Sequence, residues 1–345
     1  MRILFADKYP ESAIDELIEN GQDCVLQPDL KADELDSVVA EYDVLVVRST
    51  QVTKKAIEAG NSLKMIIRAG AGTNTIDKDA AAARGVYVCN VPGRNAAAVA
   101  ELAIGLLIAI DRNIPDNVLA LRQGNWNKKR YSVAAGLKGR RMGVVGLGAV
   151  GLEVLERAHA FGLELYVIDR PNRWRETHDR LVRIGGIKRV SSLKELAERC
   201  EILSFHIPSV ADTNKIVDAE LLARLPVGAI VINTSRGDIV DEEALIKAMD
   251  EKGIRAGLDV FCGEPSGGEA VFESILARHP NVYGTHHIGA STDQAQAAVA
   301  RGVIEILDAF SQGTVSYTHL RAHETPEHLV WRRGGEKKKG GGGGG

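Results

Sequence analysis

The sequence predicts an α/β protein with two doubly wound parallel sheets, and three observations lead to this fold class. Short β-rich runs alternate with helical stretches along most of the 345 residues, as in parallel strands joined by helices. A glycine-rich turn at residues 146–151 follows one of these runs and opens a helical stretch. The runs after this turn form a self-contained set, which predicts a second domain with its own sheet.

Five strands are predicted in the N-terminal part, at residues 3–6, 24–27, 44–48, 65–68 and 86–90. Helices are expected between them, such as 11–20 and 53–59, where Thr53 has the hydroxyl of an N-cap and Gly60 is suited to end the helix. A long apolar helix at 96–110 and another at 115–123 follow. The most apolar stretch, residues 102–110, is about half the length needed to cross a bilayer, so it predicts a buried helix.

The second set of strands is predicted at residues 141–145, 164–168, 202–206, 229–233, 255–259 and 282–285. The helix after the glycine-rich turn is expected at residues 151–161. We expect one domain at residues 98–284 and a discontinuous domain formed by residues 1–97 and 285–314.

Composition and charge narrow the class of protein. Hydrophobic residues make up 45% and charged residues 26% of the chain, the balance of a globular protein with a sizeable core. A net charge of -3 gives no reason to expect a nucleic-acid or membrane partner, and the N-terminus does not resemble a signal peptide, so we expect a cytoplasmic protein. Four separated cysteines in or beside apolar runs predict buried free thiols and no metal site: Cys24, Cys89, Cys200 and Cys262.

Residues 315–345 differ in character from the rest and are expected to be a non-native tail. Residues 315–325 have no apolar periodicity and resemble the translation of a sequencing adapter. The lysine and glycine runs at 337–345 would be encoded by an adenine run and then a guanine run. We therefore exclude this segment from the fold, and its histidines are not interpreted as metal ligands.

The glycine-rich turn, Gly-Leu-Gly-Ala-Val-Gly, has the context of a dinucleotide-binding site in a sheet of Rossmann type. Gly146 permits the tight turn, Gly148 lets the backbone approach a pyrophosphate at the helix N-terminus, and Gly151 allows close helix–strand packing. Ala149 and Val150 of the same turn complete the predicted pyrophosphate site. A purely structural turn is the alternative.

A carboxylate follows the next strand of this predicted domain. Asp169 lies about twenty residues after the turn, where it can hydrogen-bond the ribose hydroxyls and repel a 2′-phosphate. This favours NAD over NADP. Arg170 complicates the choice, since an arginine here can meet a 2′-phosphate.

Three segments at strand ends, residues 233–238, 257–265 and 286–292, carry the polar groups expected where ligands of α/β sheets bind. Together with the glycine-rich turn, these segments resemble the D-isomer-specific 2-hydroxyacid dehydrogenase family over residues 1–314. The resemblance implies a Rossmann-type NAD-binding domain at 98–284. It also implies a smaller, flavodoxin-like α/β domain that binds the substrate.

Hydride transfer at C2 of a 2-hydroxy acid needs three side-chain roles. A guanidinium holds the substrate carboxylate, and Arg236 fits. A base that titrates near neutrality takes the hydroxyl proton, and a carboxylate orients the imidazole and stabilises its charged form; His287 and Glu264 fit. His286 precedes His287, and in a strand the two would point to opposite faces. The resemblance selects His287, since the family usually has proline at position 286.

The resemblance also implies further contacts with the cofactor and the substrate. On the cofactor side they are Thr234 and Ser235 near the nicotinamide ribose, Asp259 near the carboxamide, and His206 and Pro208 near the adenosine. On the substrate side they are Arg48, Arg68, Gly70, Ala71, Gly72 and Asn95. The glycines let backbone N–H groups approach a carboxylate. Arg48 and Arg68 suit a distal phosphate, although ordinary charges at strand ends are the alternative.

Within the family, these segments most resemble D-3-phosphoglycerate dehydrogenases. This implies oxidation of D-3-phosphoglycerate to 3-phosphohydroxypyruvate in serine biosynthesis, with NAD as cofactor and a homodimer or homotetramer as the assembly. A glyoxylate, hydroxypyruvate or D-lactate type reductase is the first alternative. The second is a dinucleotide-sensing binding protein or corepressor, which has no need of the base at position 287.

Overall fold

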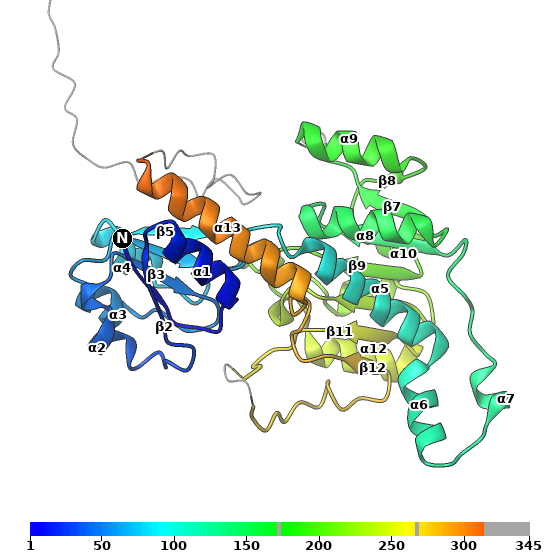
Figure 1. The fold of residues 1–345 in the computed structure, drawn as a ribbon. Coiled ribbons are helices and arrows are strands. Elements are labelled where there is room, and N and C mark those ends of the chain that lie inside the picture. The colour runs from blue at the N-terminus through cyan, green and yellow to red at the C-terminus, as the bar shows by residue number, and fades with distance from the viewer. Residues whose placement is uncertain (171–173, 266–268, 314–345) are drawn as a thin grey trace, which may run out of the picture. The chain divides into compact units, whose positions relative to one another are not determined.

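The computed structural model describes residues 1–170, 174–265 and 269–313 (Figure 1). It divides the chain into one unit formed by Met1–Pro92 with the described part of Ala297–Gly345, and a second unit, Gly93–Gln296. The boundaries differ from the expected ones at 97 and 285. The segment around His287 belongs to the second unit because its backbone hydrogen-bonds there, to Asp259. The stretch 315–345 lies outside the described residues.

The first unit is built on a five-stranded parallel sheet with the order β2-β1-β3-β4-β5. This is the flavodoxin-like order, so the predicted fold class of this part is confirmed. Each strand lies within one residue of its predicted bounds. The strands are β1 (Arg2–Phe5), β2 (Asp23–Leu26), β3 (Val44–Val47), β4 (Met65–Arg68) and β5 (Tyr87–Asn90).

Helices cover both faces of this sheet. Apolar side chains of α1 and α13 pack on one face, and those of α2, α3 and α4 pack on the other. Thr53 caps α3 as predicted, since its hydroxyl accepts a hydrogen bond from the N–H of Ala56. The helices are α1 (Glu11–Glu19), α2 (Leu35–Val38), the 3-10 turn η1 (Val39–Glu41), α3 (Lys54–Ala59), α4 (Lys78–Ala83) and α13 (Asp293–Ser311).

The second unit has a seven-stranded sheet with the order β12-β11-β10-β9-β6-β7-β8, and all its strand pairs are parallel. The strand order reverses between β6 and β9, which is the switch point where ligands of doubly wound sheets bind. The predicted Rossmann-type fold is therefore confirmed. The strands are β6 (Arg141–Val145), β7 (Glu164–Ile168), β8 (Lys188–Val190), β9 (Ile202–Phe205), β10 (Ile230–Asn233), β11 (Arg255–Leu258) and β12 (Val282–Gly284).

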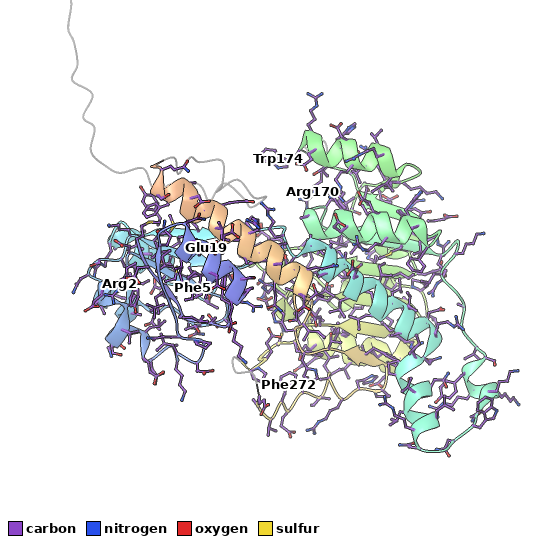
Figure 2. All side chains as sticks on the ribbon, in the orientation of Figure 1. Arg2, Phe5, Glu19, Arg170, Trp174 and Phe272 are labelled. Atoms are coloured by element: carbon purple, nitrogen blue, oxygen red, sulfur yellow. The ribbon has the colours of Figure 1, made fainter. Side chains whose placement is uncertain are left out.

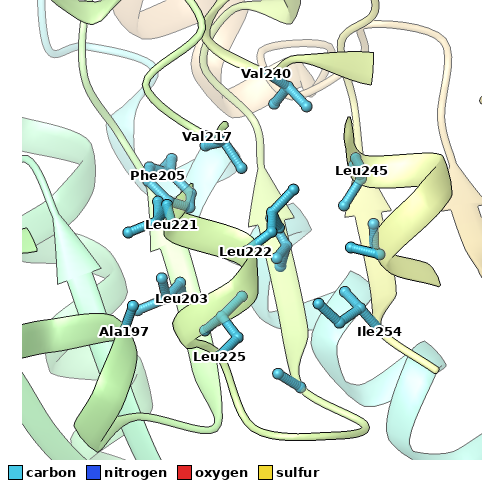
Figure 3. Packing of buried hydrophobic residues seen from close by; sticks show 14 of the residues in the cluster. Ala197, Leu203, Phe205, Val217, Leu221, Leu222, Leu225, Val240, Leu245 and Ile254 are labelled. Atoms are coloured by element: carbon cyan, nitrogen blue, oxygen red, sulfur yellow. The ribbon is translucent and has the colours of Figure 1, made fainter. Parts of the chain in front are cut away.

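Two apolar layers bury this second sheet. Helices α5, α8 and α9 supply one layer, and α10, α11 and α12 supply the other, where Leu221, Leu222 and Leu245 belong to one buried cluster with Leu203 and Phe205 (Figure 3). The helices are α5 (Ala96–Arg112), α6 (Ile114–Arg122), α7 (Lys128–Tyr131), α8 (Ala149–Ala160), α9 (Arg175–Ile184), α10 (Leu193–Arg199), α11 (Ala219–Arg224), α12 (Glu242–Lys252) and the 3-10 turns η2 (Ala211–Thr213) and η3 (Gly237–Ile239).

The sequence predicted buried free thiols and an apolar helix too short to cross a bilayer. Cys89 and Cys200 are buried and Cys24 is partly buried, but Cys262 is exposed, so the prediction was wrong there. Cys262 lies in the loop beyond β11 and not in the sheet, which explains its exposure. Among the described helices, none has the length and apolar character that a membrane span requires.

An ion-pair network joins α8 to α9 and yields a stability prediction. Glu153 contacts Arg157 at 2.6 Å and Arg180 at 2.9 Å, with 24% of its side chain exposed. Burial opposes ionisation of Glu153, but hydrogen bonds and charges from the two arginines hold its pKa below the ordinary value. This carboxylate therefore stabilises the fold above the pKa of the unfolded chain, and the contribution is lost as pH falls through the folded pKa.

We expect Glu153→Gln to lower the free energy of unfolding by about 1 kcal/mol at pH 7. The difference from wild type should shrink as pH falls below the unfolded pKa of about 4.3 and through the lower folded pKa, and it should vanish only where both states are protonated. Urea unfolding at pH 7 and at a pH below both pKa values measures this difference in the free energy of unfolding. Glu251→Gln, at an exposed i,i+4 pair with Lys247, is the control and should change little. An equal loss for Glu153→Gln at both pH values would contradict the account.

Candidate active site

The glycine-rich turn after β6 is tightly packed at two of its glycines. Gly146 has a φ of 93°, and a Cβ there would lie 2.3 Å from the carbonyl oxygen of His206. A Cβ on Gly151 would lie 1.9 Å from the carbonyl oxygen of Gly146. A side chain fits at neither position, so the turn approaches the chain after β9, and α8 approaches the turn, only because these residues are glycines.

The turn leads into a helix that begins earlier than predicted. Helix α8 starts at Ala149, with Gly148 as its N-cap, and not at Gly151. The N–H groups of its first turn, including those of Ala149, Val150 and Gly151, are the ones a helix leaves without partners. A Cβ on Gly148 would meet nothing within 4 Å, so this side of the turn is open. An anion such as a pyrophosphate fits there, stabilised by the helix dipole.

Two buried polar atoms lie beyond the neighbouring strands β9 and β10. Within the described residues, Nδ1 of His206 and Oγ1 of Thr234 are buried without hydrogen-bond partners. Burial lowers the pKa of His206 to about 3, so its ring is neutral, and Nε2 lies 2.7 Å from Oγ of Ser204. Buried polar atoms without partners are costly unless a ligand satisfies them. Together with the glycine-rich turn they fit a bound dinucleotide.

The predicted ribose-binding carboxylate lies beyond the end of β7. Asp169 is exposed, and its Oδ1 accepts a hydrogen bond of 3.0 Å from Nη1 of Arg189, on the adjacent strand β8. Its backbone N–H donates to the carbonyl of Val190. Sequence reasoning missed Arg189, because β8 is a three-residue strand with two basic residues and lacks an apolar run.

The loop after β10 carries Arg236 and is shaped by a buried amide. The side-chain oxygen of Asn233 accepts hydrogen bonds from the N–H and the hydroxyl of Ser235, and its Nδ2 donates to the carbonyl of Arg236 at 2.8 Å. Nη1 of Arg236 donates to the carbonyl of Ser235. Asn233 is fully buried, so it fixes the backbone from which the half-buried guanidinium extends. Sequence reasoning gave Asn233 no role.

An imidazole–carboxylate pair forms between the loops after β11 and β12. Nδ1 of His287 lies 2.6 Å from Oε1 of Glu264, and both side chains are partly exposed. Burial would raise the pKa of Glu264, but the hydrogen bond and charge of His287, and the charge of Arg236, leave this pKa below its ordinary value. The structure thus brings together the three side chains predicted to be catalytic, with an ionised carboxylate beside the imidazole of His287 and the guanidinium of Arg236.

The conformation at His287 differs from the prediction. Strand β12 ends at Gly284, so His286 and His287 do not lie in a strand, and the argument from alternating faces was wrong. His287 has a φ of 53°, a left-handed conformation that is uncommon for a residue other than glycine and is often found at functional sites. His286 is exposed.

The buried Asp259 holds this loop. Its Oδ1 accepts hydrogen bonds from the hydroxyl of Thr285 and the N–H of Ile288, and its Oδ2 accepts one from Gly289, over distances of 2.6 to 2.9 Å. Its backbone carbonyl accepts the N–H of His287 at 2.8 Å. The carboxylate is 1% exposed, so these bonds use both oxygens in a dry environment. Asp259 therefore fixes the backbone that presents His287.

The second unit's candidate residues follow successive strands at one edge of its sheet. His287 follows β12, Asp259 follows β11, and Arg236 lies in the loop after β10. Asp169 follows β7, three strand spacings from β10, which corresponds to about 14 Å. Pro208, beyond β9, accepts a hydrogen bond from the hydroxyl of Thr213. The pair His287–Glu264 and the carboxylate of Asp169 thus lie at opposite ends of this edge.

The first unit carries the candidates for substrate binding beyond its adjacent strands β3 and β4. The carboxylate of Asp7, after β1, accepts hydrogen bonds from the N–H groups of Arg48, Ser49 and Thr50 and from the hydroxyl of Ser49. Sequence reasoning missed Asp7. Its position directly after a buried strand, like those of Asp169 and Asp259, was the available signal.

The turn after β4 depends on glycine. Gly70 has a φ of 149°, and a Cβ there would lie 1.6 Å from Nη1 of Arg68. The carbonyl of Ala71 accepts a 2.5 Å hydrogen bond from Nδ2 of Asn90, and Gly72 follows in the same turn. Asn95 belongs to the second unit, where it is the N-cap of α5 without a side-chain capping bond.

Comparisons with known proteins agree with the resemblance found in the sequence. Residues 104–289 match the D-isomer specific 2-hydroxyacid dehydrogenase, NAD binding domain, family. A solved structure from Polaromonas sp. JS6 66, described as an NAD-binding D-isomer specific 2-hydroxyacid dehydrogenase, superposes with a TM-score of 0.80 at 27% identity, covering 91% of this chain and 97% of that one.

Two curated relatives are similar to this chain over different shares of their own length. The chain is 36% identical over 332 residues to the D-3-phosphoglycerate dehydrogenase of Methanocaldococcus jannaschii, covering 96% of this chain but 61% of that one. It is 37% identical over 306 residues to the hydroxypyruvate reductase of Thermotoga maritima, covering 88% of this chain and 96% of that one. The predicted family and the predicted NAD cofactor are thereby confirmed. The chain belongs to the D-isomer specific 2-hydroxyacid dehydrogenase family and carries its NAD-binding domain.

Proposed function

We propose that this chain catalyses reversible, NAD-dependent hydride transfer at C2 of a D-2-hydroxy acid. The observation that carries the proposal is the 2.6 Å contact between His287 and Glu264, with Arg236 close enough to act on the same carboxylate. This group lies at the edge of the sheet that carries the glycine-rich turn. A binding-only protein has no need of a base there, which counts against a corepressor.

Each of the three side chains has one role in the proposed reaction. The nicotinamide of NAD supplies the acceptor or donor of the hydride at C2. Because Nδ1 of His287 faces Glu264, Nε2 is the atom that takes the proton of the substrate hydroxyl during oxidation, and returns it to the 2-oxo oxygen during reduction. Glu264 stabilises the imidazolium that forms, and Arg236 binds the substrate carboxylate through its planar guanidinium.

The cofactor is held by groups that the structure already presents. The first turn of α8, with Gly146, Gly148 and Gly151 around it, suits the pyrophosphate. Thr234 and Ser235 suit the nicotinamide ribose and His206 suits the adenosine side, since Thr234 and His206 have buried polar atoms without partners among the described residues. Asp169 suits the adenosine ribose.

We propose D-3-phosphoglycerate as the substrate, oxidised to 3-phosphohydroxypyruvate in serine biosynthesis. The support is the likeness to the Methanocaldococcus jannaschii enzyme and the position of Arg48 and Arg68 at the carboxyl ends of the adjacent strands β3 and β4, where two guanidinium groups suit a phosphate. Gly70, Ala71 and Gly72 of the first unit are further candidates for substrate binding, and Asn95 is one in the second unit. Hydroxypyruvate is the second candidate, because the chain covers nearly the full length of the hydroxypyruvate reductase of Thermotoga maritima.

We further propose that the working assembly is at least a homodimer. Helix α6 and the residues after it expose apolar side chains that a monomer has no reason to expose together. These side chains are Ile114, Val118, Leu119, Leu121 and Trp126. Sedimentation at micromolar concentration tests the proposal, since a monomer alone would contradict it.

Steady-state oxidation of NADH, measured as kcat/KM with each of four 2-oxo acids, tests the proposed substrate. We expect 3-phosphohydroxypyruvate to exceed hydroxypyruvate, glyoxylate and pyruvate by about 100-fold in kcat/KM, since a site built for a charged group discriminates strongly against ligands without it. Equal values for the first two acids would contradict the phosphate assignment and favour the hydroxypyruvate reductase. Binding of NADH without oxidation by any acid would favour the corepressor instead.

A further inference from the structure

The adenosine end of the cofactor site contains a cation that the proposed function does not use. Arg189, on the edge strand β8, donates from Nη1 to Oδ1 of Asp169 at 3.0 Å. The two side chains are 46% and 49% exposed, so a bound ligand can reach both. Asp169 is the carboxylate expected to select NAD over NADP, so a cation in contact with it bears on that selectivity.

The geometry of the two strands explains why this contact forms. Strands β7 and β8 pair in parallel, with Val167 opposite Arg189 and Ile168 opposite Val190. The backbone N–H of Asp169 donates to the carbonyl of Val190 at 2.7 Å, which extends the pairing by one residue. The carboxylate is thereby held beside β8, within reach of the long side chain of Arg189.

A second guanidinium belongs to the same corner of the sheet. Arg170 follows Asp169 directly, is exposed, and lies between α8 and α9 in the view of Figure 2. It forms no hydrogen bond or ion pair with the residues that the structure describes. One carboxylate is therefore accompanied by two guanidinium groups, and the local formal charge is positive.

This positive local charge affects how strongly the site binds the 2′-phosphate of NADPH. An unpaired carboxylate repels the phosphate of NADPH, whereas a carboxylate already bound to a guanidinium repels it less. Arginine also binds phosphate oxygens through two parallel N–H groups. Oδ2 of Asp169 remains available to a ribose hydroxyl, because the contact with Arg189 uses Oδ1.

We propose that Arg189 determines cofactor specificity in this chain: its contact with Asp169 offsets the carboxylate charge and, with Arg170, gives the adenosine ribose site a measurable affinity for a 2′-phosphate. The chain then binds NADH in preference to NADPH, but by a smaller factor than Asp169 alone would give. The proposal deepens the cofactor site of the proposed function and rests on it.

Fluorescence titration of the purified protein with NADH and NADPH, without substrate, tests the proposal. The measured quantity is the ratio of the NADPH Kd to the NADH Kd. We expect Arg189→Gln to raise this ratio by about tenfold, the effect of one charged contact in a partly solvated site. Arg189→Lys retains the charge and should keep the ratio within about threefold of wild type.

Lys188→Gln is the matched control. It removes one positive charge from the same strand, but Lys188 pairs with Glu164 at 2.8 Å, at the opposite end of β7. The ratio should therefore stay within about threefold of wild type, because a charge at that distance is screened by salt. Equal ratios in Arg189→Gln and Lys188→Gln would overturn the proposal.

A double-mutant cycle adds an independent test. Asp169→Ser should lower the ratio by about tenfold or more, because both guanidinium groups then face the phosphate without a competing carboxylate. In the Asp169→Ser/Arg189→Gln variant most of this gain should be lost. If Asp169→Ser lowers the ratio equally with and without Arg189, Arg189 does not contact the phosphate. These titrations need no turnover, so a failed substrate assignment leaves their outcome intact.

Discussion

Replacement of His287 by asparagine should lower kcat by about 10³-fold, the usual size of a lost general acid–base group. Asparagine keeps a polar side chain and tolerates the left-handed backbone that His287 adopts, with a φ of 53°. It cannot take up or release a proton. The loss therefore reports the chemical role of the imidazole and not a rearranged loop.

Stopped-flow or steady-state oxidation of NADH with the best 2-oxo acid measures this loss, and NADH titration checks that the cofactor still binds. His286→Asn is the matched control, because His286 is the adjacent residue and is exposed. It should retain kcat within about threefold, as surface substitutions away from a site usually do. A His287→Asn variant with more than a tenth of wild-type kcat would refute the assignment.

Replacement of Asp259 by asparagine should lower kcat by about 100-fold while the Kd for NADH moves less than about threefold, because a small misplacement of a catalytic group costs rate. The carboxylate of Asp259 accepts three hydrogen bonds, two of them from the backbone N–H groups of Ile288 and Gly289. An amide would turn one of these acceptors into a donor facing a donor. The loop that carries His287 then loses its fixed conformation.

The split between kcat and Kd separates two roles for Asp259. A residue that positions His287 affects the chemical step, whereas direct contact with the nicotinamide carboxamide affects cofactor affinity. Asp250→Asn is the control, since its carboxylate is 68% exposed and contacts only His279 among the described residues. A weakened NADH Kd with kcat retained would show that Asp259 acts on the cofactor instead. Thermal unfolding should also show a lower Tm, since one buried acceptor becomes a donor and leaves a buried N–H without a partner.

The fold was largely predictable from the sequence, because its strands are short apolar runs. Every predicted strand lies within one residue of its place in the structure, and β4, β6 and β7 match in full. The edge strand β8 was missed, since Lys-Arg-Val has no apolar periodicity and forms a strand only by pairing with β7. Helix α8 begins at Ala149 and not at residue 151, an error of the size usual for helix ends.

The candidate site was predictable in its residue types but not in its supporting contacts. His287, Glu264 and Arg236 were identified from the chemistry and from the family's segments. The contacts that hold them come from residues far away in sequence, such as Asp259 with the loop after Gly284, and from the buried Asn233. Local patterns do not encode such hydrogen bonds. The strand predicted at residues 282–285 ends at Gly284. Hydrogen bonds to the carboxylate of Asp259 determine the conformation of the loop beyond it.

The stereochemical fate of a deuteride is the most direct test of the central claim. NADH deuterated at C4 of the nicotinamide is incubated with wild-type protein and 3-phosphohydroxypyruvate, hydroxypyruvate, glyoxylate or pyruvate, and each product is examined by NMR and chiral chromatography. We expect deuterium at C2 of a 2-hydroxy acid and the D configuration in every chiral product. An L product, deuterium elsewhere, or no product with any of the four acids would contradict the central claim.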